Sequence, residues 1–173
     1  MPSAEDAIEM VRGRVCLVDG TITPCWSYAD RDELWSRKHG TTGFNAQLVC
    51  LLNGDAVYIS DPLSGRVHDA TAFATTPVAE IVRNSGGGIA DKGYQGRGMV
   101  TPRKTPPGGA LSIGDKKNNS IISGLRAPVE RVVAHFKSWR ILHTDYRRPY
   151  RTYRYAYDAA RGLFFFSLTW GFE

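Results

Sequence analysis

The chain has 173 residues, of which 42% are hydrophobic, and this length and composition predict a single globular domain. It contains no run of 18 apolar residues, which argues against a transmembrane helix, and its acidic start MPSAEDAIEM lacks the core of a signal peptide. The three cysteines, Cys16, Cys25 and Cys50, form no C-x-x-C pair, so the sequence favours a reduced, cytoplasmic protein over a disulfide framework or a zinc site.

The charge is distributed unevenly along the chain. Residues 1–90 hold 7 Lys and Arg against 11 Asp and Glu, a net charge of −4, whereas residues 91–173 hold 15 against 6, a net charge of +9. A strongly basic half favours a polyanionic partner, most often nucleic acid, and ordinary solubilising charge is the alternative.

The first part of the chain is predicted to consist of strands. RVCLVDGTITPCW (14–26) predicts two short strands that meet at Asp19-Gly20, so that Asp19 ends a buried strand where it opens to solvent. NAQLVCLLNGDAVYISD (45–61) predicts a hairpin whose tight turn lies at Asn53-Gly54. This hairpin argues against a purely parallel sheet.

Short helices, a short strand and a loop are predicted next. HDATAFATTPVAEIVRN (68–84) predicts one or two short helices, and Asp69 could cap the first of them. GGGIADKGYQGRG (86–98) predicts a very short strand that ends at Asp91. Residues 101–120 are rich in Pro, Gly, Lys and Asn and predict a long loop.

The last part of the chain is predicted to be helical. RAPVERVVAHFKSW (126–139) predicts a helix with Pro128 in its first turn and an apolar stripe for the core, formed by Val129, Val132, Val133 and Phe136. A second helix is predicted from about 152 to 168, after a break at Pro149. The order of all these elements predicts an α/β domain with a mixed sheet flanked by helices.

Three carboxylates are predicted to meet at one edge of this sheet. Asp19 and Asp91 each end a predicted strand, and Glu130 lies in the first turn of the helix that packs on the same sheet. Such a cluster needs a cation, and Mg²⁺ is the natural one, because it is a hard ion held by carboxylates, water and phosphate. Two such ions ~3.5–4 Å apart activate a nucleophile and stabilise a leaving oxygen in phosphoryl transfer.

Five segments, in order, resemble the DDE transposases of bacterial insertion sequences, in the group related to the eukaryotic PIF/Harbinger elements. They are DGT (19–21), HGTTGFNAQLVCLLNGDAVYIS (39–60), LSGRVHDATAF (63–73), ADKGYQG (90–96) and RAPVERVVAHFKSWRIL (126–142). The last is similar to the family's Tyr-x₂-Arg-x₃-Glu-x₆-Lys pattern, with Arg126, Glu130 and Lys137 at the matching positions. Two departures are Ser123 in place of the tyrosine and Leu63 where the family often has a proline-glycine lead-in.

The resemblance implies an RNase H-like fold and a catalytic triad of Asp19, Asp91 and Glu130 that binds two Mg²⁺ or Mn²⁺ ions. It also implies that Lys137 contacts a DNA phosphate near the cut end and that Arg126 pairs with a phosphate or a carboxylate. The implied activity is metal-dependent cleavage of DNA followed by strand transfer into target DNA, by a homo-oligomer on paired transposon ends.

The family's N-terminal helix-turn-helix region, which recognises the transposon ends, has no counterpart in this sequence. Residues 1–173 would then be the catalytic domain alone, since the first catalytic aspartate follows only 18 residues from the start. A separately encoded domain could supply the recognition of the ends, or the chain could be a truncated or adopted copy.

Several further residues have two interpretations each. His68 and Asp69 match a family motif and could add a fourth acidic group near the metals, or they could be a helix cap beside a surface histidine. Lys92 and Tyr94 could contact DNA or shape the turn that they occupy.

A basic segment near the C-terminus also has two interpretations. Its arginines alternate with tyrosines, as in a surface that contacts phosphates and stacks on bases, and the DNA-binding candidates among them are Arg147, Arg148 and Arg151. Alternatively, the tyrosines pack a helix and the arginines are only solvated. His39 and His135 have no ligand-like partners in the sequence and are predicted to be structural.

Three functions compete at this point. The first is a transposase catalytic core acting on DNA in the bacterial nucleoid, and the second is a remnant that binds DNA or full-length transposase without cutting. The third is a host nuclease on the same fold. Loss of a metal-dependent activity on Asp91→Ala would separate the first from the second, and only a transposase should join strands.

Overall fold

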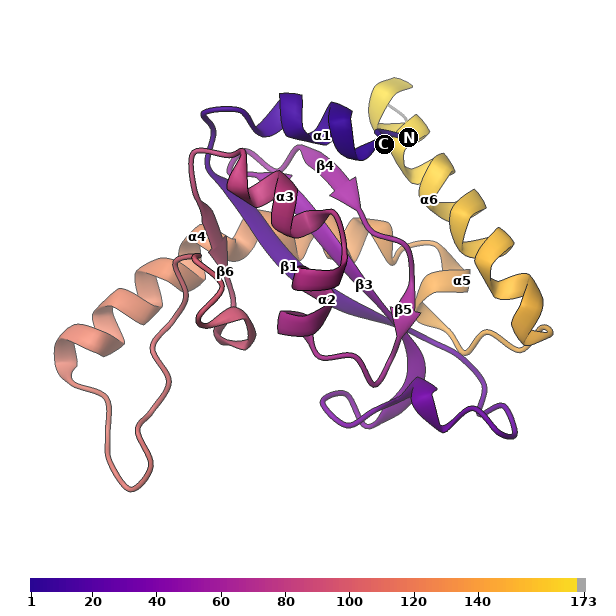
Figure 1. Ribbon diagram of the computed structural model, residues 1–173, viewed down its shortest axis with the longest axis horizontal. Helices are drawn as coiled ribbons and strands as arrows, with labels where there is room; N and C mark the ends of the chain where they lie inside the picture. The colour runs from indigo at the N-terminus through magenta and orange to yellow at the C-terminus, as the bar shows by residue number, and fades with distance from the viewer. Residues whose placement is uncertain (171–173) are drawn as a thin grey trace.

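A six-stranded mixed sheet forms the centre of the protein, of which the computed structural model describes residues 1–170 (Figure 1). Strand β3 (Thr41–Leu51) is antiparallel to β1 (Cys16–Pro24), whereas β6 (Gly88–Ala90) is parallel to β1. The other strands are short and antiparallel to β3, and they are β2 (Trp35–Ser36), β4 (Ala56–Ile59) and β5 (Leu63–Ser64). The predicted α/β class with a mixed sheet is confirmed.

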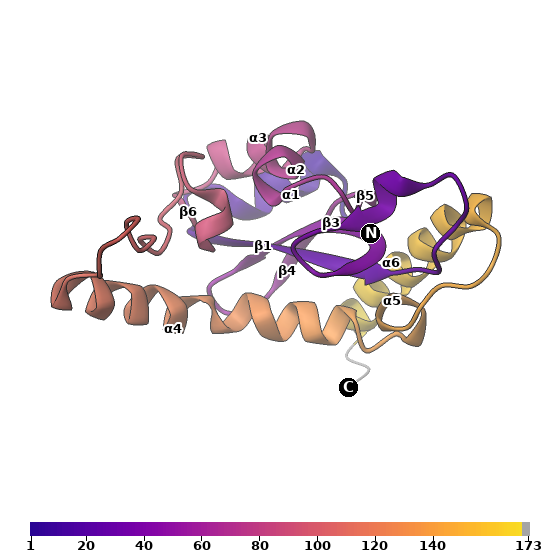
Figure 2. The same cartoon turned by 90° about the horizontal axis from the view of Figure 1, so that it is seen from below.

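Helices cover both faces of this sheet, as Figure 2 shows. One face carries α1 (Ala4–Val11), α2 (Asp69–Thr75) and α3 (Val78–Arg83). The other face carries α4 (Ile113–Phe136), α5 (Arg140–His143) and α6 (Tyr153–Trp170). Three short 3₁₀ helices complete the chain, and they are η1 (Asp32–Leu34), η2 (Lys92–Tyr94) and η3 (Tyr150–Thr152).

Side chains of β1 alternate between the two cores that these helices form with the sheet. Val18 is buried in the core beneath α1, α2 and α3, and Leu17 is buried in the core beneath α4 and α6. Because successive side chains of a strand point to opposite faces, Asp19 lies on the α4 side and Gly20 on the α2 side. This alternation decides which helix each functional residue meets.

Strand β1 runs without a break through Asp19-Gly20, so the prediction of two short strands is wrong. It stays paired with β3 on both sides of that point, with Asp19 opposite Leu48 and Gly20 opposite Gln47. Long-range pairing outweighs the local turn preference of an Asp-Gly pair. Asp19 therefore lies in the middle of its strand, and it is the neighbouring strand β6 that ends beside it, at Ala90.

Helix α4 begins at Ile113, so the prediction of a loop over 101–120 is wrong for its last part. Ser112 caps the helix, because its Oγ accepts a hydrogen bond from the backbone N–H of Asp115 at 3.0 Å. The Ser-x-x-Asp spacing is a known start signal, and it was present in the sequence. Pro128 consequently lies in the helix interior and not in the first turn.

Other local predictions are confirmed. The hairpin β3–β4 turns at Asn53-Gly54, where Gly54 has a φ of 97° that favours glycine. The helix pair α2 and α3, the short strand β6 and the final helix α6 all lie where the sequence predicts them. The stripe of α4 faces the core, with Val129, Val132 and Phe136 buried and Val133 partly buried.

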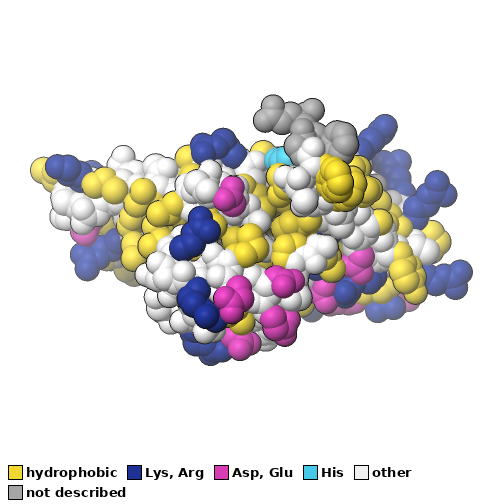
Figure 3. All heavy atoms as spheres, turned by 90° about the horizontal axis from the view of Figure 1, so that it is seen from above, with side chains coloured by type: hydrophobic (Ala, Val, Ile, Leu, Met, Phe, Trp, Pro, Cys, Tyr) yellow, Lys and Arg dark blue, Asp and Glu magenta, His cyan; other side chains and the backbone are white. Residues whose placement is uncertain are grey.

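The surface over α1 and the end of α6 carries both charges and apolar side chains (Figure 3). Acidic side chains gather on one part of this face, in agreement with the acidic first turn of α1, which contains Glu5 and Asp6. Across residues 1–170, no helix combines the length and the apolar character needed to cross a membrane.

Candidate active site

Asp19 and Asp91 follow paired residues on neighbouring parallel strands. Val18 of β1 pairs with Ala90 of β6, so the two aspartates are the next residues along strands that are roughly 4.8 Å apart. The pKa of Asp19 is raised to about 6, mainly because its carboxyl group is buried and also because the charge of Asp91 is near. Arg126, the backbone N–H of Gly20 and Lys38 oppose this rise.

Arg126 links Asp19 to Glu130. Its Nη2 lies 3.1 Å from Asp19 Oδ2 and its Nη1 lies 3.7 Å from Glu130 Oε1. The side chain of Arg126 is 13% exposed and that of Asp19 is 18% exposed, whereas that of Glu130 is 58% exposed. The structure thus makes Arg126 a partner of carboxylates, and it brings Glu130 to the side of the sheet on which Asp19 lies.

Lys38 is a second cation at this site, and the sequence interpretation missed it. Its Nζ lies 2.5 Å from Asp69 Oδ2 and 4.0 Å from Asp91 Oδ2. Burial by itself would lower the pKa of Lys38, but the hydrogen bond to Asp69 and the charges of Asp69, Asp91 and Asp19 raise it. The only signal in the sequence was its place next to the HGTTG segment that resembles the family.

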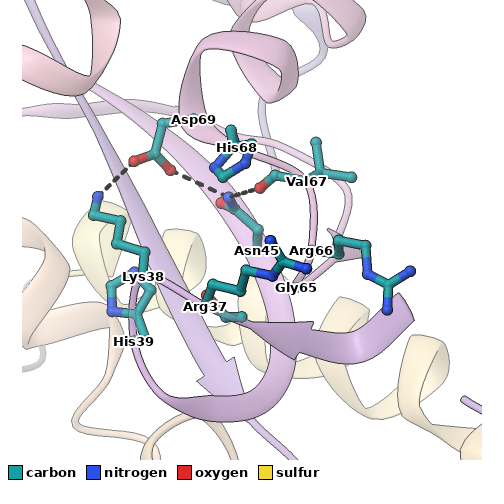
Figure 4. Close-up of a pocket in the computed structure, with 10 residues that line it drawn as sticks. Arg37, Lys38, His39, Asn45, Gly65, Arg66, Val67, His68 and Asp69 are labelled. Atoms are coloured by element: carbon teal, nitrogen blue, oxygen red, sulfur yellow. Dashed lines mark hydrogen bonds and ion pairs between the residues drawn. The ribbon is translucent and has the colours of Figure 1, made fainter. Parts of the chain in front are cut away.

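A buried chain of hydrogen bonds holds Asp69 in place. The Tyr94 hydroxyl donates to Gln47 Oε1 at 2.6 Å, Gln47 Nε2 donates to Asn45 Oδ1 at 3.0 Å, and Asn45 Nδ2 donates to Asp69 Oδ1 at 3.2 Å. Figure 4 shows the last link and the bond from Lys38 on the other carboxylate oxygen. We call the chain Tyr94–Gln47–Asn45–Asp69–Lys38 the buried relay.

The relay decides between the interpretations of two candidate residues. Asp69 is not a helix cap, because the cap position of α2 is His68 and no side chain bonds there. Asp69 instead places an acidic group beside Lys38, close to Asp91. Tyr94 is completely buried and supports the turn after Asp91, so its placement favours the turn-shaping role over contact with DNA.

Gly20 leaves the space that the relay occupies. A Cβ atom at this position would lie 2.5 Å from Asp69 Oδ1 and 2.9 Å from Gln47 Nε2. Gly20→Ala is therefore expected to displace Asp69 and to lower the free energy of unfolding by about 1–3 kcal/mol, measured by urea denaturation.

A matched control for this substitution lies in helix α4. Gly124→Ala adds the same methyl group at a helical position with no heavy atom within 4 Å, and it should stabilise the protein by about 0.5–1 kcal/mol. Equal free energies of unfolding for wild type and Gly20→Ala would contradict the tight packing of Asp69 against β1.

The residues of this site suit a hard divalent cation in their chemistry, because carboxylate oxygens are its preferred ligands. Within residues 1–170, however, no three His, Cys, Asp or Glu side chains are grouped as a metal site. Arg126 bonds to both Asp19 and Glu130 and so lies between their carboxylates. Because Glu130 is largely exposed, turning its side chain toward Asp19 would cost little packing.

The predicted DNA-binding lysines lie in two different environments. Lys137 Nζ donates to the backbone oxygen of Ile22 at 2.9 Å, and burial lowers the pKa of Lys137. Lys137 is thereby tied to β1 rather than projecting into solvent. Lys92 is exposed in η2 and lines a groove of about 750 Å³ that also contains Asp91 and Arg126.

The basic segment near the C-terminus lies apart from the carboxylates. Figure 1 shows the connection between α5 and α6 at the opposite end of the sheet from β6. The guanidinium of Arg147 lies over the ring of Trp26 at 4.9 Å, and Arg148 and Arg151 are exposed. Of the alternating tyrosines, Tyr146 and Tyr153 are buried in the core, as the packing interpretation expects, whereas Tyr150 and Tyr155 are exposed.

The two histidines predicted to be structural differ in their surroundings. His135 packs edge-on against Phe164 with 5.1 Å between ring centroids, which is a structural role. His39 is exposed and lines a cavity next to Lys38.

Comparisons with known proteins identify the family of the chain. A family profile described as "DDE superfamily endonuclease" matches residues 18–163, a range that includes Asp19, Asp91 and Glu130. No solved structure gives a significant match to the chain. The subgroup related to PIF/Harbinger elements is not resolved by these matches and stays a prediction.

Two curated relatives carry the names of transposases. A protein of Microchaete diplosiphon, "Probable transposase for insertion sequence element IS702", is 32% identical over 130 residues, which are 71% of this chain and 42% of the relative. A protein of Streptomyces albus G, likewise named as a transposase, for insertion sequence element IS112, is 31% identical over 132 residues, 74% of this chain and 49% of the relative. The chain thus spans less than half the length of either relative. The profile match and the identity to these relatives show that the chain belongs to the DDE superfamily endonucleases.

Proposed function

We propose that this chain is the catalytic core of an insertion-sequence transposase, which cuts DNA and joins the cut end to target DNA. The observation that carries the proposal is the placement of Asp19 and Asp91 at the end of β6, with Glu130 linked to Asp19 through Arg126. Carboxylates at this place in an open α/β sheet face the crevice where ligands bind. The names of the two relatives support transposition over other DNA cleavage.

In this proposal Asp19, Asp91 and Glu130 would hold two Mg²⁺ or Mn²⁺ ions, and the ions would supply activation of the attacking oxygen and stabilisation of the leaving oxygen. The roles of the protein side chains follow from their contacts. Arg126 and Lys38 balance the carboxylate charges before substrate binds, so that the negative groups stay together in the fold. Both cations also lie beside the groove that a DNA strand would follow.

That groove, of about 750 Å³, is lined by residues suited to a phosphodiester backbone. Among its described residues, Asp91 is the single acid, and the basic ones are Lys38, Lys92, Arg103, Lys104 and Arg126. Positive side chains of this kind contact phosphates without reading the sequence. The groove therefore supports the proposal that DNA is the substrate, with its backbone bound next to Asp91.

The test is a strand-joining assay. Labelled duplexes with 3′-hydroxyl ends of random sequence are incubated with supercoiled plasmid and Mn²⁺, and covalent transfer of the label into the plasmid is measured. We expect joined products, because the 3′-hydroxyl of the duplex attacks a plasmid phosphodiester, forms a new bond to its phosphorus and displaces the 3′-oxygen of the plasmid strand. Sequencing the joined ends would also reveal the preferred terminal sequence.

The rival functions give different products in the same assay. Nicked or linear plasmid without joined label would indicate a nuclease and contradict the transposase assignment. Binding of plasmid with neither product would indicate a remnant that binds DNA without catalysis, or a core that needs a separate recognition domain. Adding the full-length protein of a relative as a helper would separate these last two.

A further inference from the structure

A second cavity adjoins the groove that contains Asp91 and Arg126, and Lys38 lines both of them. It has a volume of about 380 Å³ and lies between the segment that follows β2 and the segment that joins β5 to α2. In Figure 4 Arg37 and His39 lie below Asn45, His68 and Asp69 lie above it, and Lys38 reaches up to Asp69. Lys38 lines both hollows, so the cavity adjoins the proposed catalytic carboxylates.

The cavity carries an excess of positive charge. Its lining includes the basic residues Arg37, Lys38 and Arg66, and Asp69 is the single acid among its described residues. Both oxygens of that acid are occupied, since Oδ2 accepts from Lys38 and Oδ1 accepts from Asn45.

The two arginines have no acidic partner. Arg66 Nη2 donates to the backbone oxygen of Asp32 at 2.9 Å, and within residues 1–170 the Arg37 side chain makes no hydrogen bond or ion pair. Both side chains are exposed at the cavity. A pair of uncompensated guanidinium groups beside one cavity is suited to an anion with several oxygen acceptors.

Of the two parts of a DNA strand that could enter the cavity, the lining favours the phosphate over a base. Eight of its ten residues are polar or charged, and among those described no Phe, Tyr or Trp ring offers a stacking platform. The floor is also rigid, because the buried relay fixes Asp69 and Asn45 through Gln47 and Tyr94. Lys38 is therefore held at a defined place between this cavity and Asp91.

We infer that this cavity binds backbone phosphate of the DNA strand next to the phosphodiester that is cut, through Arg37 and Arg66. The inference rests on the proposed function and deepens it, because it names a second contact that fixes the strand relative to Asp91. Neither arginine belongs to a segment from which the sequence predicted DNA contact.

The experiment measures binding of a fluorescein-labelled 30-base-pair duplex by anisotropy, in EDTA and at several salt concentrations. The variant Arg37→Gln/Arg66→Gln is compared with wild type and with Arg12→Gln/Arg83→Gln, which removes two exposed arginines of α3 and of the end of α1. We expect about ten-fold weaker binding for the cavity variant and a salt slope smaller by about 2, one for each lost phosphate contact. The conservative variant Arg37→Lys/Arg66→Lys should keep most of the salt slope.

The outcomes distinguish the cavity from the function as a whole. If the cavity variant binds with the affinity and salt slope of the control variant, the phosphate site is overturned while the proposed function stands. If the wild type binds no DNA, both are overturned. A circular dichroism melt of each variant shows whether the exposed substitutions leave the fold unchanged.

Discussion

Asp91→Asn is expected to reduce Mn²⁺-dependent nicking of supercoiled plasmid by about 10³-fold or more. Losses of this size are typical when one member of a group of catalytic residues is removed. Asparagine keeps nearly the same volume, and its oxygen can still accept the hydrogen bond that Gly93 N–H donates to Asp91 Oδ1 at 2.7 Å. The turn should therefore persist, while the negative charge next to Asp19 is lost. The measurement is the rate of conversion from supercoiled to open-circle plasmid.

A matched control is Asp55→Asn, in the exposed turn between β3 and β4. This substitution removes one negative charge from a residue that is distant from Asp91 in the chain. The variant should therefore nick the plasmid at the rate of the wild type. Equal nicking by wild type and Asp91→Asn would point to a contaminating nuclease, and the assignment of Asp91 as a metal ligand would lose its support.

The second large effect is expected in the pH dependence of stability. The folded pKa of Asp19 is about 6, above its ordinary value of 3.8, so the folded protein holds this proton more tightly than the unfolded chain. The stabilisation is fully present below pH 3.8 and is lost as the pH rises through 6. Relative to Asp19→Asn, the wild type should lose roughly 3 kcal/mol over this window in metal-free buffer, since each pKa unit corresponds to about 1.4 kcal/mol.

Urea denaturation in EDTA between pH 3.5 and 7.5 measures this difference. Parallel stability curves for wild type and Asp19→Asn would show that Asp19 titrates normally and that its burial is not costly. At pH 7, Mg²⁺ should stabilise the wild type more than Asp19→Asn, because a ligand that binds only the folded state adds to its stability. Asp55→Asn again serves as the control, since it should respond to Mg²⁺ as the wild type does.

Elements specified by local signals could be predicted from the sequence. The Asn53-Gly54 turn, the apolar stripe from Val129 to Phe136 and the final helix depend on neighbouring residues, and each lies where it was expected. The start of α4 was missed although the Ser112-x-x-Asp115 spacing indicates a helix start. The Pro- and Gly-rich composition of the preceding residues was given more weight.

The site was only partly predictable, because motifs are local in the chain whereas contacts between distant segments are not. Asp19, Asp91 and Glu130 were predicted from motifs, and the strand register and Arg126 bring them to one region. The role of Lys38 could not be derived, because its partners Asp69 and Asp91 are 31 and 53 positions away in the chain.

The sequence by itself determined the family and the α/β class and predicted the three carboxylates, because motif spacing and hydrophobic periodicity are local properties of the chain. Only the tertiary structure decided that β1 continues through Asp19, that the buried relay ends at Lys38, and that Arg37 and Arg66 line one cavity. These features arise from pairing and packing between segments that are distant in the chain. Their stability depends on both segments together, so no single stretch of sequence predicts them.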